Sequence, residues 1–153
     1  MNMIKLPVEV KLLTKTAHLP KYESEEAIGF DIAADEEYIL EGKTNGMVST
    51  GLSFAVPTGY EIQIRPRSGM SAKTKLRISN SPGTVDPDYR GEVKILVDNI
   101  GKETITINKG DRIAQGVLSE NPKAEFKVVD KLNETERGEN GIGSTGTNIS
   151  ENK

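Results

Sequence analysis

Hydrophobic and polar positions alternate along much of this chain, starting within its first dozen residues. Leu6, Val8, Val10 and Leu12 are separated by single residues, and two of those three intervening residues are charged. A period of two is typical of a β-strand with one face buried and the other in water. The first element is therefore predicted to be a strand at residues 6–12.

Short segments of the same kind recur along the chain, and glycine, proline or asparagine separates them. Residues 68–76 have room for a turn or two of helix. This pattern predicts an all-β domain, built as a sandwich, a jelly roll or a barrel. Further strands are expected at residues 28–33, 48–56, 60–65, 75–79, 92–98, 104–107, 112–118 and 125–129, with turns at 41–42, 45–46, 57–59, 108–110 and 121–122.

The last part of the chain has a different composition. In residues 130–153 the only aliphatic side chains are Leu132, Ile142 and Ile149, while glycine and asparagine are frequent. Such a segment cannot form a core of its own. We expect a folded domain at residues 1–129, followed by an arm at 130–153 that is either disordered or ordered by a ligand or a neighbouring subunit.

Composition and charge narrow the function further. The 153 residues suit one domain, and the absence of cysteine excludes disulfides, zinc-thiolate sites and a cysteine nucleophile. The single histidine, His18, is expected on the surface. With 20 basic and 23 acidic residues, the net charge of −3 argues against binding long nucleic acid but leaves a small anionic ligand open. No signal peptide or membrane-spanning segment is evident, so a soluble cytoplasmic protein is expected.

Residues 80–91, with the sequence NSPGTVDPDYRG, have the strongest character of a functional site. Asp86 precedes Pro87, which restricts the backbone of both residues and so fixes the direction of the carboxylate. Tyr89 follows, and Arg90-Gly91 precedes a predicted strand. We expect a hairpin that carries an acid and an aromatic ring. The alternative is a turn whose residues serve turn formation alone.

Two further segments carry charged groups. In GFDIAA, Asp31 points away from its apolar neighbours on a strand, where it is either a surface residue or part of a site. In RPRSGMSAK, the cations Arg65, Arg67 and Lys73 lie around Ser68-Gly69. Guanidinium groups, a hydroxyl and backbone N–H groups are donors suited to phosphate oxygens. A solvated basic turn is the alternative.

The segments KGDRIAQGV and RGENGIGSTG complete the set. On a regular strand Gln115 shares a face with Ile113 and Val117, so its amide needs a structural partner or a ligand. The second segment matches GxGxxG, but it lacks the strand, the helix and the later acid of a dinucleotide-binding fold. Its glycines, hydroxyls and Arg137 can still surround an anion.

Taken in order, five motifs resemble those of the trimeric deoxyuridine triphosphatases: GFDIAA, PRSGMSAK, NSPGTVDPDYRGE, GDRIAQ and RGENGIGSTG. The resemblance covers residues 28–147. It implies a distorted jelly-roll subunit and a homotrimer with active sites at subunit interfaces, each completed by the flexible glycine-rich C-terminal arm of a neighbour. It also implies Mg²⁺-dependent hydrolysis of dUTP to dUMP and pyrophosphate, which keeps uracil out of DNA and supplies dUMP for dTMP synthesis.

The resemblance implies a role for each matching residue. Asp86 is similar to the carboxylate that positions and deprotonates the attacking water, and Tyr89 to the ring that excludes a 2′-hydroxyl. Asn80 and the backbone near Val93 and Lys94 resemble the groups that pair with uracil. The implied phosphate contacts are Arg67, Ser68, Gly69 and Gln115, with Arg137, Gly143, Ser144 and Thr145 from the arm; Asp31 lies near the metal and the arginines, and no residue is a direct metal ligand.

One position departs from the family pattern, because Ile142 stands where the arm usually has a phenylalanine that stacks on uracil. Ile142 can cover the base but cannot stack on it. Three other functions stay open: a dCTP deaminase or bifunctional deaminase, a dUTP-sensing regulatory protein, and a β-sandwich interaction module. The deaminases tend to carry a second serine where this chain has Gly69, which ranks them below the triphosphatase.

Overall fold

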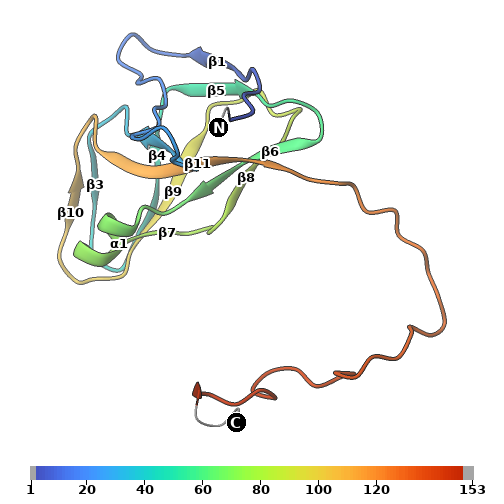
Figure 1. Ribbon diagram of the computed structural model, residues 1–153. Coiled ribbons are helices and arrows are strands. Elements are labelled where there is room, and N and C mark those ends of the chain that lie inside the picture. The colour runs from blue at the N-terminus through green and yellow to red at the C-terminus, as the bar shows by residue number, and fades with distance from the viewer. Residues whose placement is uncertain (1–2, 150–153) are drawn as a thin grey trace. The chain divides into compact units, whose positions relative to one another are not determined.

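The computed structural model describes residues 3–149 and shows a mainly β protein with one short helix (Figure 1). The chain divides into two compact units, Met1–Lys123 and Ala124–Lys153. All strands lie in the first unit. They are β1 (Glu9–Leu12), β2 (Phe30–Ala33), β3 (Tyr38–Leu40), β4 (Asn45–Ser49), β5 (Leu52–Ala55), β6 (Tyr60–Arg65), β7 (Leu76–Ile78), β8 (Gly83–Val85), β9 (Lys94–Asn99), β10 (Ile105–Ile107) and β11 (Arg112–Glu120); the helix α1 is Ser68–Lys73.

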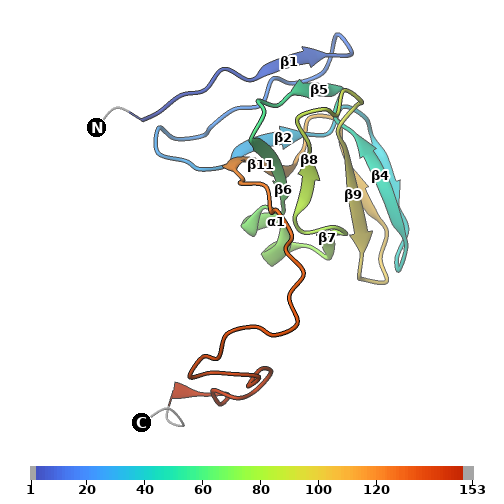
Figure 2. The same cartoon turned by 90° about the vertical axis from the view of Figure 1, so that its right-hand side faces the viewer.

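The strands of the first unit form antiparallel sheets around one apolar core. A four-stranded sheet has the order β2-β11-β6-β8, and a three-stranded sheet has the order β4-β9-β7. Two-stranded sheets, β1-β5 and β10-β3, complete the unit, and Figure 2 shows β8 beside β9. The alternation seen in the sequence explains the core, since every second residue faces inward. Its most buried side chains include Ile32, Leu40, Val48, Leu52, Ile62, Ile95, Val97 and Ile113.

Most of the predicted strands are confirmed, and the predicted helical turns at 68–76 are present as α1. The prediction was wrong where it gave a single strand at 48–56. Thr50 and Gly51 separate β4 from β5, and Gly51 has a φ of 68°, which a strand does not accommodate. The predicted turn at Asn45-Gly46 was also wrong, because both residues begin β4.

Two short strands, β3 and β8, were not predicted. Each has only three residues, so its pattern is too short to show a period. The strand predicted at 125–129 was wrong for a different reason. Phe126 and Val128 do alternate with charged residues, but they are 93% and 97% exposed, and no strand forms anywhere in residues 124–149.

The second unit consists of turns within its described part, residues 124–149. Gly138, Gly143 and Gly146 adopt positive φ values, which glycine reaches without strain. The backbone N–H of Ser144 donates to the carbonyl oxygen of Gly141 at 3.0 Å, and Arg137 Nε donates to the carbonyl oxygen of Asn140 at 2.8 Å. Across the described residues, 3–149, no helix has the length and apolar character needed to cross a membrane.

Candidate active site

A fork between β7 and β9 opens a cavity in the first unit. β7 pairs with β9 from Leu76↔Asn99 to Ile78↔Val97, and the N–H of Ser79 still donates to the carbonyl oxygen of Leu96 at 2.9 Å. The chain then leaves β9 at Asn80 and joins β6 as β8. Because alternate residues of a strand point their N–H and C=O to the same side, those of Lys94 face the side that β7 has left.

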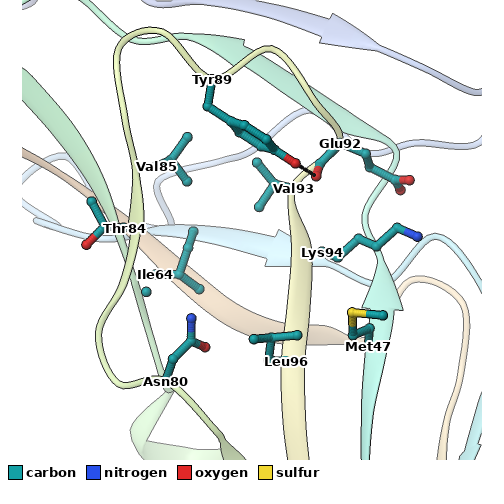
Figure 3. Close-up of a pocket in the computed structure, with 11 residues that line it drawn as sticks. Met47, Ile64, Asn80, Thr84, Val85, Tyr89, Glu92, Val93, Lys94 and Leu96 are labelled. Carbon is teal, nitrogen blue, oxygen red and sulfur yellow. Dashed lines mark hydrogen bonds between the residues drawn. The ribbon is translucent and has the colours of Figure 1, made fainter.

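The fork encloses a cavity of about 390 Å³ that is lined from both branches. Figure 3 shows Asn80 at one end, Tyr89 at the other, Thr84 and Val85 along one side, and Val93, Lys94 and Leu96 along the other. Met47 from β4, Ile64 from β6, Gly83 and Glu92 complete the lining. Apolar walls with a few amide and backbone groups suit a flat, partly polar ligand.

Tyr89 lies across one end of this cavity in a fixed position. Its hydroxyl donates to the carbonyl oxygen of Glu92 at 2.8 Å, although the residue is 45% exposed. A Cβ at residue 91 would lie 2.5 Å from that hydroxyl oxygen, so the ring needs a glycine there. Gly91 therefore leaves the space that the Tyr89 ring occupies.

The connection from β8 to β9 is attached to the start of β5 by hydrogen bonds. The buried hydroxyl of Thr50 donates to the carbonyl oxygen of Val93 at 2.5 Å, and that of Ser53 donates to the carbonyl oxygen of Arg90 at 2.6 Å. The carboxylate of Glu92 accepts the backbone N–H of Gly51 at 3.0 Å. These bonds hold the connection that carries Tyr89 in one conformation.

Asp86 lies on the same connection, directly after β8, and its side chain is exposed. Its carbonyl oxygen accepts the N–H of Tyr89 at 3.2 Å, which closes the turn around Pro87. The predicted hairpin was wrong in its pairing, because β8 pairs with β6 while β9 pairs with β4 and β7. The absence of a β8–β9 ladder is what leaves the cavity open.

A second polar cluster gathers around Asp31 on β2. Oδ1 of Asp31 contacts Nε of Arg67 at 3.1 Å, and Oδ2 contacts Nη1 of Arg112 at 3.1 Å. Arg112 also contacts Glu23 at 3.2 Å, and Arg67 donates to the carbonyl oxygen of Arg112 at 3.0 Å. The Asp31 side chain is only 13% exposed, so it orients two arginines and is not a free surface residue.

Gln115 lies beside this cluster, at the register position opposite Asp31. Its Nε2 donates to the carbonyl oxygen of Pro66 at 2.9 Å, which is the structural partner that its amide required. The prediction that it faces the same way as Ile113 was wrong. The register shifts between Arg112 and Ala114, and this bulge separates Ile113 from the face that Gln115 shares with Val117.

Ser68 and Gly69 begin helix α1 directly after Arg67. The first N–H groups of any helix have no acceptor inside it, so these two residues offer backbone donors next to a guanidinium. Both residues are exposed. Phosphate oxygens are well matched to this combination of donors.

The predicted residues thus fall into separate groups. Asn80, Tyr89, Val93 and Lys94 line the fork cavity, with Asp86 on its border connection. Asp31, Arg67 and Gln115 form the polar cluster, and none of them lines that cavity. The arm residues, Arg137, Ile142, Gly143, Ser144 and Thr145, belong to the second unit and are exposed within it.

Some residues of the site were not singled out from the sequence. Thr50, Ser53 and Glu92 fix the connection through backbone contacts, and Arg112 joins Asp31 to Glu23. Arg112 lies inside GDRIAQ, so the motif was a signal for it. The anchoring hydroxyls gave no such signal, since their partners are carbonyl groups about forty residues away.

Outside both groups, the buried carboxyl of Asp35 has a pKa below its ordinary value. Burial on its own raises the pKa, because it disfavours the charged form. Hydrogen bonds from Thr14 at 2.5 Å and Thr16 at 2.8 Å, together with the charges of Lys109 and His18, outweigh that effect. His18 itself is exposed, as predicted.

Comparison with known proteins identifies the family that carries this arrangement. The model of the dUTPase family matches residues 15–146. The chain belongs to the dUTPase family. A deoxyuridine 5'-triphosphate nucleotidohydrolase from Bdellovibrio bacteriovorus is 50% identical over 147 residues, covering 94% of this chain and 99% of that relative.

Solved dUTPase structures share the fold. The dUTPase of Staphylococcus bacteriophage 80alpha with dUpNHpp has a TM-score of 0.88 at 29% identity. The match covers 94% of this chain and 100% of the phage chain. A variant dUTPase from phage phi11 of S. aureus has a TM-score of 0.78 at 26% identity, covering 83% and 99%. The latter structure is described as showing the coordination of a structural Mg(II) ion.

The dUTPase chain described here offers no protein cage for a metal. Among residues 3–149, no group of three or more histidine, cysteine, aspartate or glutamate side chains is placed to hold an ion. Mg²⁺ that accompanies a nucleotide is usually bound through phosphate oxygens and water with few protein ligands.

Proposed function

We propose that this protein hydrolyses dUTP to dUMP and pyrophosphate by attack of a water molecule on the α-phosphorus. The observation that carries this proposal is the fork cavity, which has an amide at one end, a fixed tyrosine ring at the other and Asp86 on its border. Membership of the dUTPase family supports the same substrate. One of the solved neighbours is a dUTPase with dUpNHpp bound.

In the proposed complex, the uracil occupies the gap that β7 leaves beside β9. The amide of Asn80 and the backbone N–H and C=O of Lys94 pair with the polar edge of the base. The Tyr89 ring lies under the deoxyribose, where a 2′-hydroxyl would collide with it. The sugar is then selected by the steric collision with Tyr89, and the base is selected by its hydrogen bonds to Asn80 and Lys94.

Asp86 is the proposed general base. It accepts a proton from water while the water oxygen bonds to the α-phosphorus and the bond from that phosphorus to the bridging oxygen breaks. The electron pair leaves with pyrophosphate. An ionised carboxylate within hydrogen-bond reach of the water is sufficient for this step.

Phosphate charge is the second requirement of the reaction. We assign phosphate contacts to Arg67, Ser68, Gly69 and Gln115, with Asp31 holding Arg67 in place. Mg²⁺ bound with the nucleotide supplies further neutralisation of the phosphate oxygens. The arm contributes Arg137, Gly143, Ser144 and Thr145, and Ile142 covers the base without stacking on it.

The division of these residues supports a homotrimer of distorted jelly-roll subunits. Asp86 borders the fork cavity, whereas the phosphate-binding group around Arg67 lines no part of it. A second copy of the chain can supply the missing group at each cavity. Mixing inactive Asp86→Asn chains with inactive Arg67→Gln chains is therefore expected to restore activity, and a mixture that stays inactive contradicts the shared site.

The decisive experiment measures pyrophosphate release from dUTP, dTTP, UTP and dCTP, with and without Mg²⁺. We expect release from dUTP alone, and Asp86→Asn should lower turnover by about three orders of magnitude or more while dUpNHpp still binds. Asp88→Asn is the matched control, since Asp88 is an exposed aspartate on the same connection. Full activity of Asp86→Asn, or ammonia release from dCTP, would contradict the proposal.

A further inference from the structure

A second hollow of the first unit lies next to the phosphate-binding group. It measures about 360 Å³ and is lined by Gln63, Arg65, Pro66, Ser81, Pro82 and Gln115. None of these lining residues is a carboxylate, and one of them is an arginine. A hollow with a cation and no acid on its wall favours an anionic group.

Strand register places Arg65 in line with residues that the proposed function already uses. Gln115 on β11 lies opposite Asp31 on β2 and also opposite Arg65 at the end of β6. Directly opposed residues of antiparallel strands point to the same face of the sheet. Asp31, Gln115 and Arg65 therefore form one row across three neighbouring strands.

The guanidinium of Arg65 is held in a defined orientation. Oε1 of Gln63, two residues earlier on the same strand, accepts from Nε at 3.1 Å and from Nη2 at 2.8 Å. Within residues 3–149, no acceptor contacts Nη1 of Arg65. The side chain therefore offers unused N–H donors whose direction is fixed before any ligand arrives.

Among the described residues, positive charge is not neutralised at the Arg65 end of this row. Arg67 and Arg112 share the carboxylate of Asp31, and Arg112 also contacts Glu23. Arg65 has no carboxylate partner in the part of the chain that the structure describes. Gln115 uses one N–H for the carbonyl of Pro66, and an amide has a second N–H to donate.

We propose that Arg65, oriented by Gln63, extends the phosphate-binding group and contacts the terminal phosphates of the substrate and the pyrophosphate that is released. The inference rests on the proposed function for the identity of the anion. It adds a residue pair, Gln63 and Arg65, that lies outside the five motifs. The hollow accommodates the end of the phosphate chain that lies farthest from the base.

Titration of the full chain with inorganic pyrophosphate, followed by calorimetry, tests this without any nucleotide. Arg65→Gln is expected to weaken pyrophosphate binding about tenfold, the loss typical of a charge-assisted contact. Arg65→Lys keeps the charge without the planar fork, so its affinity for pyrophosphate is expected to lie between those of wild type and Arg65→Gln. Gln63→Leu releases the guanidinium and should weaken binding less than Arg65→Gln does.

Lys102→Gln is the matched control, because it removes one exposed positive charge that lines neither cavity. Thermal melting of each variant confirms that it is folded. Equal affinity of wild type and Arg65→Gln overturns the inference, as does an equal loss in Lys102→Gln or a wild type that binds no pyrophosphate. Hydrolysis of dUTP, assayed on the same samples, separates this outcome from failure of the proposed function.

Discussion

At the scale of single residues, Tyr89 keeps its position because residue 91 has no side chain. The hydroxyl oxygen of the ring lies 2.5 Å from the point where a Cβ of residue 91 would stand. The φ of Gly91 is not positive, so the requirement is for space and not for an unusual backbone conformation. The position of the Tyr89 ring therefore depends on Gly91 as well as on its own hydrogen bond to Glu92.

Gly91→Ala is expected to displace the tyrosine ring and reduce the preference for dUTP over UTP about tenfold or more, since a displaced ring no longer excludes the 2′-hydroxyl. The measurement is the ratio of kcat/KM for the two nucleotides. Gly59→Ala serves as control, because no atom lies within 4 Å of its added methyl group although its φ of 88° introduces strain. An unchanged ratio in Gly91→Ala would show that the ring has another support.

Sequence reasoning identified Asn80, Tyr89, Val93 and Lys94, and the structure brings these residues to one cavity. It succeeded there because the residues are close together in the chain, within one motif and the two residues that follow it. It did not find Glu92, whose carboxylate bonds to Gly51, or the contact by which Gln63 orients Arg65. Their roles depend on which strands become neighbours, and the spacing along the chain does not contain that information.

At the scale of elements, the connection between β8 and β9 is held from outside by β5. Ser53 is 7% exposed and donates to the carbonyl of Arg90, in the middle of the connection. A partly buried carbonyl that loses its donor retains part of the cost of desolvation without the compensating bond. The position of Tyr89 is therefore linked to Ser53 of β5, through the carbonyl of the neighbouring residue Arg90.

Ser53→Ala is expected to lower the free energy of unfolding by about 1–2 kcal/mol and to raise KM for dUTP more than it changes kcat. Chemical denaturation and steady-state kinetics measure the two effects. Ser49→Ala, at a half-buried serine of β4, is the control with no side-chain bond to this connection. A variant that loses stability with an unaltered KM would assign Ser53 to the fold alone.

The errors in the predicted elements have one physical origin. Alternation predicted where most strands form, but it did not specify their partners, so the hairpin expected around Asp86 and Tyr89 is not a paired ladder. The segment at 125–129 shows the same limit. Its residues alternate as a strand does, yet a strand also needs a neighbouring edge, and none is supplied within residues 124–149.

At the scale of the whole molecule, Asp35 joins three distant parts of the first unit. Its carboxylate accepts from Thr14 and Thr16 near the N-terminal strand, while Lys109 approaches to 3.9 Å from the loop before β11. Asp35 itself follows β2. The network therefore contributes to the stability of the first unit by joining these segments.

Because the pKa of Asp35 is lower in the folded protein than in the unfolded chain, the unfolded chain binds the proton first. The resulting stability is fully present above the ordinary value of about 3.9 and is lost as the pH falls through the lower folded pKa. Asp35→Asn should therefore flatten the decline of unfolding free energy below about pH 4, measured by denaturation at a series of pH values. Asp88→Asn should retain the decline; equal curves for wild type and Asp35→Asn would contradict the assignment.

Because the chain divides into two units, removal of the second unit is expected to reduce ligand binding and turnover while the core of the first unit stays folded. The apolar core lies in the first unit, and Ile142 and the arm glycines contribute nothing to it. A chain ending at residue 129 is expected to bind dUpNHpp more weakly and to lose at least about tenfold in kcat, because the arm's phosphate donors are missing. Calorimetry and turnover measure this, and full activity of the shortened chain would remove the arm from the proposed site.

The fork at Asn80 also bears on whether another chain can add a strand to this sheet. An unpaired stretch of backbone beside a strand is a place where a foreign chain can add itself. Here the exposed branch, β8, has only three residues, and the Tyr89 ring blocks one end of the gap. The opening therefore offers little length along which a polypeptide could dock as an extra strand, although the backbone groups of Lys94 are left without a β7 partner.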